Sequence, residues 1–113
     1  MNRGEVVDVD WPYSDLSGTK VRPAVVVQAD FLNALVDDTI FVKITGRRYG
    51  IPGTEVELDP AAETAAGLVK VCYASCKDIL TKDQTLVLRT VGLLSDTAMQ
   101  QIEACLKVVM KLP

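Results

Sequence analysis

The sequence predicts a mainly β fold of the α+β class, a small closed or half-closed barrel with one amphipathic helix at the C-terminal end. Several short segments alternate between apolar and polar residues, which is the period of half-buried strands. Only the last segment has the residue spacing of an amphipathic helix. Many short strands followed by one helix favour a barrel, and 113 residues suit one domain, expected to span residues 1–113.

Two strands are expected near the N-terminus. Residues 5–11 alternate, with Val9 and Trp11 on the face expected to be buried, and a proline ends this strand. Turn residues over 13–20 predict a loop. The continuous apolar run within residues 21–28 then predicts a central strand.

The middle of the chain continues as strands and connectors. A short turn or helical turn is expected over 30–35, a long loop over 46–53, and a connector with room for a turn of helix over 59–66. Further strands are predicted at 39–45, 54–58, 68–75 and 86–91, with a shorter one at 78–81.

The terminal segment has the signals of a helix start. Ser95 is a good N-cap, and Leu94 and Met99 occupy the two positions of a hydrophobic staple. Apolar residues then recur at helical spacing: Ala98, Ile102, Cys105, Leu106 and Val109. This stripe is expected to pack on the sheet.

Composition excludes several kinds of chemistry. The chain has no histidine, which removes serine-histidine and cysteine-histidine hydrolase mechanisms and the commonest metal ligand. We expect no metal and no cofactor, with Cys72, Cys76 and Cys105 as packing residues of the core. The apolar runs are too short to span a bilayer and no signal core follows Met1, so we expect a cytoplasmic protein without a membrane anchor.

The charge pattern requires any nucleic-acid site to be local. A net charge of −3 argues against broad attraction to phosphates, since such binding grows from a basic face. Two predicted loops are nevertheless bracketed by basic residues: Lys20, Arg22, Lys43, Arg47 and Arg48. Solvated loop residues are an equally good interpretation of these charges on composition alone.

Arg22 and Thr45 stand out within these two regions. Pro23 holds the residue before it extended, so the Arg22 guanidinium projects from a stiff strand entry and can bind two oxygens of one phosphate. Thr45 ends a predicted strand beside the 46–53 loop, where its hydroxyl could bind another phosphate oxygen. A plain strand-end role for Thr45 is the alternative.

The order of motifs resembles a known family. The chain contains Arg3-Gly4-Glu5-Val6-Val7, then Asp10-Trp11-Pro12-Tyr13-Ser14-Asp15-Leu16-Ser17-Gly18-Thr19-Lys20, then Arg22-Pro23-Ala24-Val25-Val26-Val27. This order resembles the MazF/PemK toxins of bacterial type II toxin-antitoxin modules. The likeness continues through Asn33, Ile44-Thr45, Gly67-Leu68 and Val91-Gly92-Leu93-Leu94-Ser95, so it covers essentially the whole chain.

The resemblance implies an SH3-like barrel with a C-terminal helix, usually a homodimer. It implies a metal-independent, sequence-selective endoribonuclease that cuts single-stranded mRNA through the 2′-hydroxyl of the RNA, and a cognate antitoxin that binds the same region. Arg22 and Thr45 fall on the catalytic positions of the family. The two loops that contact RNA would contribute Tyr13, Ser17, Lys20, Gly46, Arg47 and Arg48.

The chain departs from the family pattern at three places. Gly46 stands where the family often has serine, Leu93 where many members have arginine, and Cys72 near another usual serine. Two other interpretations remain open at the level of sequence. One is a toxin of the same fold that binds DNA gyrase without cutting RNA; the other is a non-catalytic SH3-like module that binds a peptide on its aromatic residues.

Overall fold

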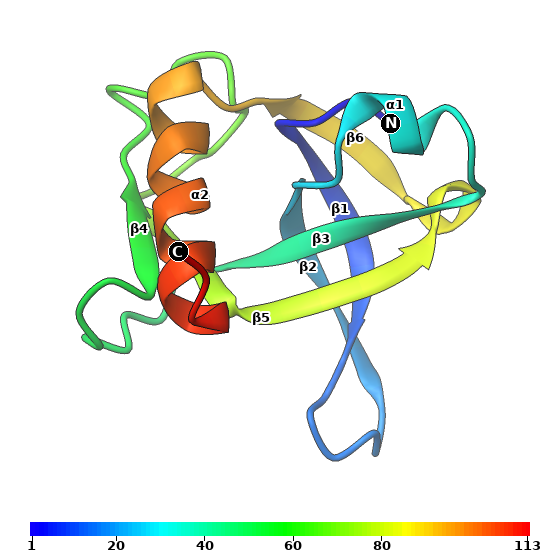
Figure 1. The fold of residues 1–113 in the computed structure, drawn as a ribbon, viewed down its shortest axis with the longest axis horizontal. Coiled ribbons are helices and arrows are strands. Elements are labelled where there is room, and N and C mark those ends of the chain that lie inside the picture. The colour runs from blue at the N-terminus through cyan, green and yellow to red at the C-terminus, as the bar shows by residue number, and fades with distance from the viewer.

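The computed structural model describes all 113 residues and contains one curled antiparallel sheet with a helix against it (Figure 1). The strand order is β4-β5-β3-β2-β1-β6. The elements are β1 (Glu5–Pro12), β2 (Thr19–Val26), α1 (Asp30–Asn33), β3 (Asp38–Thr45), β4 (Glu55–Leu58), β5 (Cys72–Asp83), β6 (Arg89–Leu93) and α2 (Asp96–Met110). This half-barrel with a C-terminal helix confirms the predicted fold class. None of the helices is both long and apolar enough to cross a lipid bilayer.

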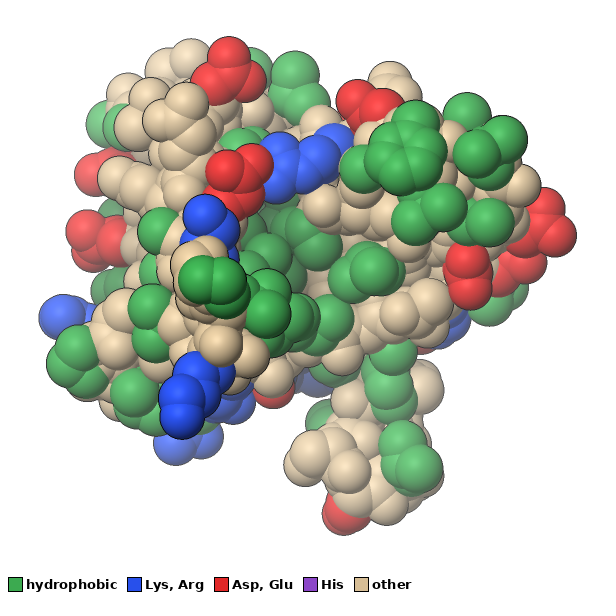
Figure 2. Space-filling model, viewed as in Figure 1, with side chains coloured by type: hydrophobic (Ala, Val, Ile, Leu, Met, Phe, Trp, Pro, Cys, Tyr) green, Lys and Arg blue, Asp and Glu red, His purple; other side chains and the backbone are tan.

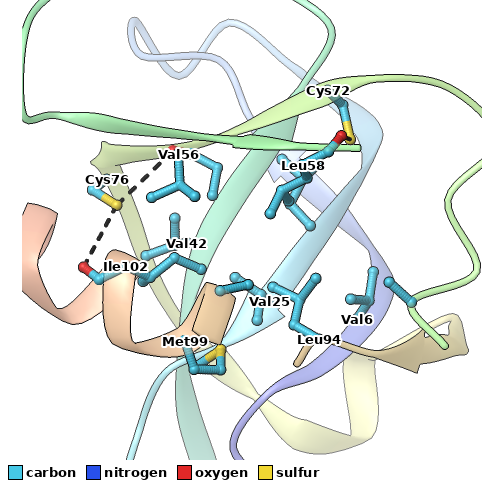
Figure 3. Packing of buried hydrophobic residues seen from close by; sticks show 14 of the residues in the cluster. Val6, Val25, Val42, Val56, Leu58, Cys72, Cys76, Leu94, Met99 and Ile102 are labelled. Atoms are coloured by element: carbon cyan, nitrogen blue, oxygen red, sulfur yellow. Dashed lines mark hydrogen bonds between the residues drawn. The ribbon is translucent and has the colours of Figure 1, made fainter. Parts of the chain in front are cut away.

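Alternation along the strands produces two apolar cores, one on each face of the curled sheet. Val25 and Val42 belong to the larger core, which α2 covers with Ile102 (Figure 3). The neighbouring residues of the strands point to the other face and form the smaller core: Val7, Val9, Trp11, Ala24, Val26 and Phe41. The expected burial of Trp11 with the Val9 face is confirmed, with 8% of the residue exposed.

The terminal helix begins as predicted. The Ser95 hydroxyl accepts a hydrogen bond from the Ala98 amide at 3.1 Å, and the Glu63 carboxylate accepts hydrogen bonds from the amide and hydroxyl of Ser95. Leu94 and Met99 are both buried, as the staple requires. The buried stripe of the helix comprises Ala98, Met99, Ile102 and Cys105.

Strand β5 corrects one prediction. The two separate strands expected at 68–75 and 78–81 are a single strand from Cys72 to Asp83. Its register on β3 jumps between Ile79, which lies opposite Val42, and Ser75, which lies opposite Lys43. Residues 76–78 therefore form a three-residue bulge without partners on β3. The bulge interrupts the alternation without ending the strand.

Smaller corrections concern the connectors. Residues 59–66 form turns with no helix, and the strand predicted at 86–91 begins at Arg89. A 3-10 helix at Gln84–Leu86 precedes it, because the Asp83 carboxylate accepts the Thr85 amide at 2.8 Å and starts a turn. The helical turn expected over 30–35 is confirmed as α1.

A close approach of two backbones joins β6 to the turn before β5. A Cβ atom on Gly92 would lie 2.4 Å from the Ala65 carbonyl oxygen, and one on Gly67 would lie 2.4 Å from the Val91 oxygen. Gly67 also has a φ of +72°. Only glycine fits at either position without a shift of the backbone. The Leu93 amide donates to the Ala65 oxygen at 2.9 Å across this contact.

Candidate active site

Arg22 lies where the ladder between β2 and β3 ends. It pairs with Val9 on β1, and the last β2–β3 pair is Ala24 with Lys43. Continuing that register by two residues brings Arg22 opposite Thr45. The two residues singled out from the sequence line the same hollow where the β2–β3 ladder ends. Arg22 and Pro23 lie in the middle of β2 and do not form the strand entry that the sequence predicted, because β2 begins at Thr19 and pairs with β1 from there.

The Arg22 guanidinium has all of its hydrogen-bond donors available. Three other arginines are paired with carboxylates: Arg3 with Glu103, Arg48 with Glu55, and Arg89 with Asp8. Arg22 has neither an ion pair nor a hydrogen bond within the chain, although it is half-buried. A half-buried cation without a partner favours the binding of an anion.

Two hollows border this guanidinium, and Arg22 is the one side chain that lines both. The first has a volume of about 470 Å³ and lies beneath the β1–β2 hairpin, which projects from the body of the protein in Figure 2. The second has a volume of about 300 Å³ and is lined by Thr45, Gly46 and Lys70. An extended polymer bound across Arg22 could therefore occupy both hollows, with one of its repeating residues in each.

Thr45 presents a hydroxyl to the second hollow. The residue is 8% exposed, and its Oγ1 accepts the Arg47 amide at 3.2 Å, which leaves the hydroxyl hydrogen free to donate. Lys70 lies beside the next residue, since a Cβ atom on Gly46 would be 3.7 Å from Lys70 Nζ. The second hollow therefore combines two cations without acidic partners, Arg22 and Lys70, with one hydroxyl donor and the ion pair between Asp8 and Arg89.

The 46–53 loop is held in place by Glu55 on β4. The Glu55 carboxylate accepts the amides of Tyr49 at 3.0 Å and Gly50 at 2.8 Å. The Tyr49 ring lies against two cations, with Arg47 at 4.5 Å and Lys77 at 4.0 Å from its centroid. These contacts place Tyr49 in the wall of the first hollow.

The β5 bulge supplies a carboxylate to the first hollow. Asp78 Oδ2 accepts the Ser75 hydroxyl at 2.7 Å and Lys77 Nζ at 3.0 Å, and Lys43 Nζ lies 3.6 Å away. Burial raises the pKa of Asp78, but the hydrogen bonds from Ser75 and Lys77 and the charge of Lys43 outweigh it and hold the pKa below its ordinary value. The carboxylate is therefore charged at neutral pH.

The structure brings most of the predicted site residues together. The first hollow is lined by Tyr13, Ser17, Lys20 and Arg22, and the second by Arg22, Thr45 and Gly46. Arg47 does not line the first hollow itself, but it contacts the ring of Tyr49, which does. Arg48 lines neither; its side chain is 73% exposed and lies beside Glu55 in a separate shallow depression.

Seven charged residues that line the two hollows were not predicted as site residues: Asp8, Asp15, Lys43, Lys70, Lys77, Asp78 and Arg89. Lys43 was identified from the sequence as one of the basic residues beside the predicted loops but was assigned no role in the site. The signal for Lys77 and Asp78 was the break in alternation after Ser75, which the structure explains as a bulge. Lys70 stands in a segment predicted as a strand, and nothing in its neighbourhood along the chain marks it.

The three cysteines are packing residues, as predicted. Cys72, Cys76 and Cys105 are all free and buried. Figure 3 shows Cys76 among the side chains of the larger core, with its thiol toward the Ile102 carbonyl. Burial raises the pKa of Cys76 to about 12, so this thiol stays protonated at neutral pH. No three Cys, Asp or Glu side chains converge to hold a metal ion.

Comparison with known proteins gives one family and a consistent fold. The profile of the PemK-like, MazF-like toxins of type II toxin-antitoxin systems matches residues 2–110. No curated protein sequence matches the chain. The residues of both hollows therefore lie within the part of the chain that matches the profile of one toxin family.

Solved structures resemble the chain over all or nearly all of its length. One is a mycobacterial endoribonuclease bound to its cognate antitoxin, with 23% identity, a TM-score of 0.82, and coverage of 100% of this chain and 97% of that one. The Mycobacterium tuberculosis toxin MazF-mt6 has 19% identity, a TM-score of 0.78, and coverage of 96% and 98%. A MazE-MazF complex from Deinococcus radiodurans has 16% identity, a TM-score of 0.76, and coverage of 100% and 98%. The similarity confirms the predicted fold.

Proposed function

This chain belongs to the PemK-like, MazF-like toxins of type II toxin-antitoxin systems, and from that premise we propose that it is an endoribonuclease that cuts single-stranded mRNA without a metal ion. The observation that carries the proposal is the unpaired Arg22 guanidinium between two hollows, one of which the Thr45 hydroxyl also lines. A cation and a hydroxyl that line one hollow suit a phosphate.

The proposed reaction uses a nucleophile from the RNA. The ribose 2′-hydroxyl attacks the adjacent phosphorus, the bond from phosphorus to the 5′-oxygen of the next nucleotide breaks, and the products are a 2′,3′-cyclic phosphate and a 5′-hydroxyl. Arg22 and the Thr45 hydroxyl stabilise the charge that develops on the phosphorane oxygens. Removal of one such group costs about 10²–10³ in rate. Arg22 does not act as the base, because a guanidinium stays protonated.

The electrostatics of the site support an anionic substrate despite the net charge of −3. Lys20, Arg22 and Lys70 have no acidic partner and line the two hollows. The RNA backbone would cross Arg22, with the hairpin residues Tyr13, Ser17 and Lys20 on one side. On the other side lies the loop that contains Gly46, Arg47 and Arg48.

We also propose the partners and setting that belong to this function. A cognate antitoxin would cover the same surface with an acidic and apolar segment and so compete with RNA. Solved relatives include a mycobacterial endoribonuclease and a Deinococcus MazF in complex with their antitoxins. The toxin would act as a homodimer in the cytoplasm, where it would arrest translation and growth.

A cleavage assay tests the proposal. Purified protein is incubated with mixed single-stranded RNA in excess chelator, and the new ends are sequenced after capture of 5′-hydroxyl groups. We expect cleavage by the wild type and a loss of about 10²–10³ in Arg22→Ala and in Thr45→Ala, with unchanged circular dichroism. Lys107→Ala, on the exposed side of α2, is the charge-matched control and should cut normally. Intact RNA with folded wild type would refute the proposal.

A growth assay gives an independent measurement. Induction of the wild type should arrest growth, and Arg22→Ala should relieve the arrest at the same level of soluble protein. If Arg22→Ala arrests growth as strongly as the wild type, the harm does not come from this site. That result would favour a toxin that acts by binding.

A further inference from the structure

We propose that the hollow beneath the β1–β2 hairpin is a nucleobase subsite in which Asp78 selects a base with an amino group, so that uridine is rejected at one position of the cleaved RNA. The inference rests on the proposed function and adds to it the residue that reads the sequence. Its structural basis is the β5 bulge, the free oxygen of Asp78 and the aromatic lining of the hollow.

The bulge at residues 76–78 is what brings a carboxylate into the hollow. On both sides of it β5 pairs regularly with β3, through Ile79 opposite Val42 and Ser75 opposite Lys43. The extra residues have no ladder partner on β3, and Lys77 and Asp78 line the hollow together with Arg22. Bulges of this kind redirect side chains beside functional sites.

Asp78 has one oxygen committed and one available. Every interaction of its carboxylate within the chain uses Oδ2, with the Ser75 hydroxyl at 2.7 Å, Lys77 at 3.0 Å and Lys43 at 3.6 Å. No group of the chain donates to Oδ1, although the side chain is only 23% exposed. An ionised carboxylate oxygen can only accept, so its partner must be a donor.

The lining of the hollow suits a base more than a phosphate at this point. Trp11, Tyr13 and Tyr49 all contribute to its wall, and unpaired bases of single-stranded RNA are held by stacking on such side chains. Lys77 and Lys43 already face the Asp78 carboxylate, so a phosphate is attracted more strongly to Arg22, which has no acidic partner. The backbone would therefore stay at Arg22 while the neighbouring base turns toward Asp78, in a space of about 470 Å³.

Base chemistry then determines the preference. Cytosine offers its N4 amino group, adenine its N6 amino group, and guanine its N1 and N2 hydrogens, and each can donate to Oδ1. Uracil has carbonyl oxygens on both sides of its N3–H, and these would face a negative charge. A mismatch of this kind reduces binding about 10- to 100-fold.

The first test measures the sequence preference of cleavage. An RNA with a randomised window is cut, and the 5′-hydroxyl ends are sequenced. We expect uridine to be depleted about 10- to 100-fold at one position beside the cut in the wild type. Asp78→Asn keeps an oxygen that can accept from Ser75 and gains an amide donor that can face a uracil carbonyl. It should therefore cut at sites with uridine at that position.

The second test measures binding without chemistry. Hexamers of cytidine and of uridine with 2′-O-methyl groups cannot supply the nucleophile, and their affinities are compared by fluorescence anisotropy. The wild type should bind the cytidine hexamer about tenfold more tightly, and Asp78→Asn should bind both equally. Asp15→Asn removes the other negative charge of the hollow; it should strengthen both affinities alike and keep their ratio.

The outcomes separate the inference from the proposed function. RNA cleaved with uridine tolerated at every position beside the cut, or an Asp78→Asn profile identical to the wild type, overturns the inference and leaves the nuclease intact. If the folded wild-type protein cuts no RNA, the proposed nuclease activity is refuted. The selection of a base during cleavage is then refuted as well. Equal affinity of the wild type for the two hexamers overturns the subsite whether or not RNA is cut.

Discussion

The substitution Gly92→Ala tests the close approach between β6 and the turn before β5. A Cβ atom at this position would lie 2.4 Å from the Ala65 oxygen, 2.4 Å from the Ala66 carbonyl carbon and 2.5 Å from the Ala66 oxygen. All three are backbone atoms, so no side chain can rotate away. Ordinary contact begins near 3.4 Å, so the two backbones must separate by about 1 Å.

The expected loss of stability has two parts. Forcing extra volume into a packed region costs about 1–3 kcal/mol. The separation also breaks the hydrogen bond from the Leu93 amide to the Ala65 oxygen, worth about 0.5–1.5 kcal/mol. We therefore expect the free energy of unfolding to fall by about 1.5–4.5 kcal/mol, a large share of the roughly 5–15 kcal/mol of a typical domain.

The assay is urea unfolding followed by the fluorescence of Trp11, the one tryptophan of the chain, which lies in the smaller core. All variants carry Arg22→Ala, which should remove toxicity, and are compared at one protein concentration. Gly46→Ala is the matched control, because its Cβ would meet Lys70 Nζ at 3.7 Å, an ordinary contact. A free energy of unfolding for Gly92→Ala within about 0.5 kcal/mol of the reference, with an unchanged m-value, would refute the reasoning.

Three further predictions concern the site and the core. Gly46→Ser should fold normally and raise the single-turnover cleavage rate about 2- to 10-fold over Gly46→Ala, because its hydroxyl adds a donor beside Thr45; equal rates for the two would contradict this. Glu55→Ala should raise KM about tenfold with a smaller effect on kcat, because the amides of Tyr49 and Gly50 lose their acceptor; an unchanged KM would show that the loop keeps its position without it. Burial raises the pKa of Cys76 from 9.0 to about 12, so the unfolded chain loses this proton at lower pH than the folded one, and stability should fall as pH rises from 9 to 12. Urea midpoints across that range should decline less steeply in Cys76→Ala than in the wild type, and parallel declines would count against this assignment.

Local pattern was enough to predict most of the fold. Val25 and Val26 are neighbours that enter different cores, and a continuous apolar run is what a strand covered on both faces requires. Ser95 starts α2 because a hydroxyl at that position satisfies a free amide, which is a property of a few adjacent residues. Periodicity could not distinguish the β5 bulge from the end of a strand, because three unpaired residues interrupt the alternation in both cases.

Only the part of the site that is encoded in local sequence motifs was predicted. Arg22 and Thr45 were found through their motifs, and the tip of the hairpin directly precedes the strand that contains Arg22. Lys70 precedes β5 and lines the second hollow. Asp78 reaches the surface near Arg22 through the register of β5 on β3, where the pairs on either side of the bulge join residues more than thirty positions apart. That register depends on the whole sheet, so no window of the sequence contains it.

The β5 bulge also affects how such a site can change over evolution. Because residues 76–78 have no ladder partner on β3, the side chains of Lys77 and Asp78, which line the first hollow, can be replaced without altering the backbone pairs on either side. Cys76 is the exception, since its side chain is fully buried in the larger core. Lys77 and Asp78 can therefore vary under selection for a new target, while the strands that hold Arg22 and Thr45 retain their spacing.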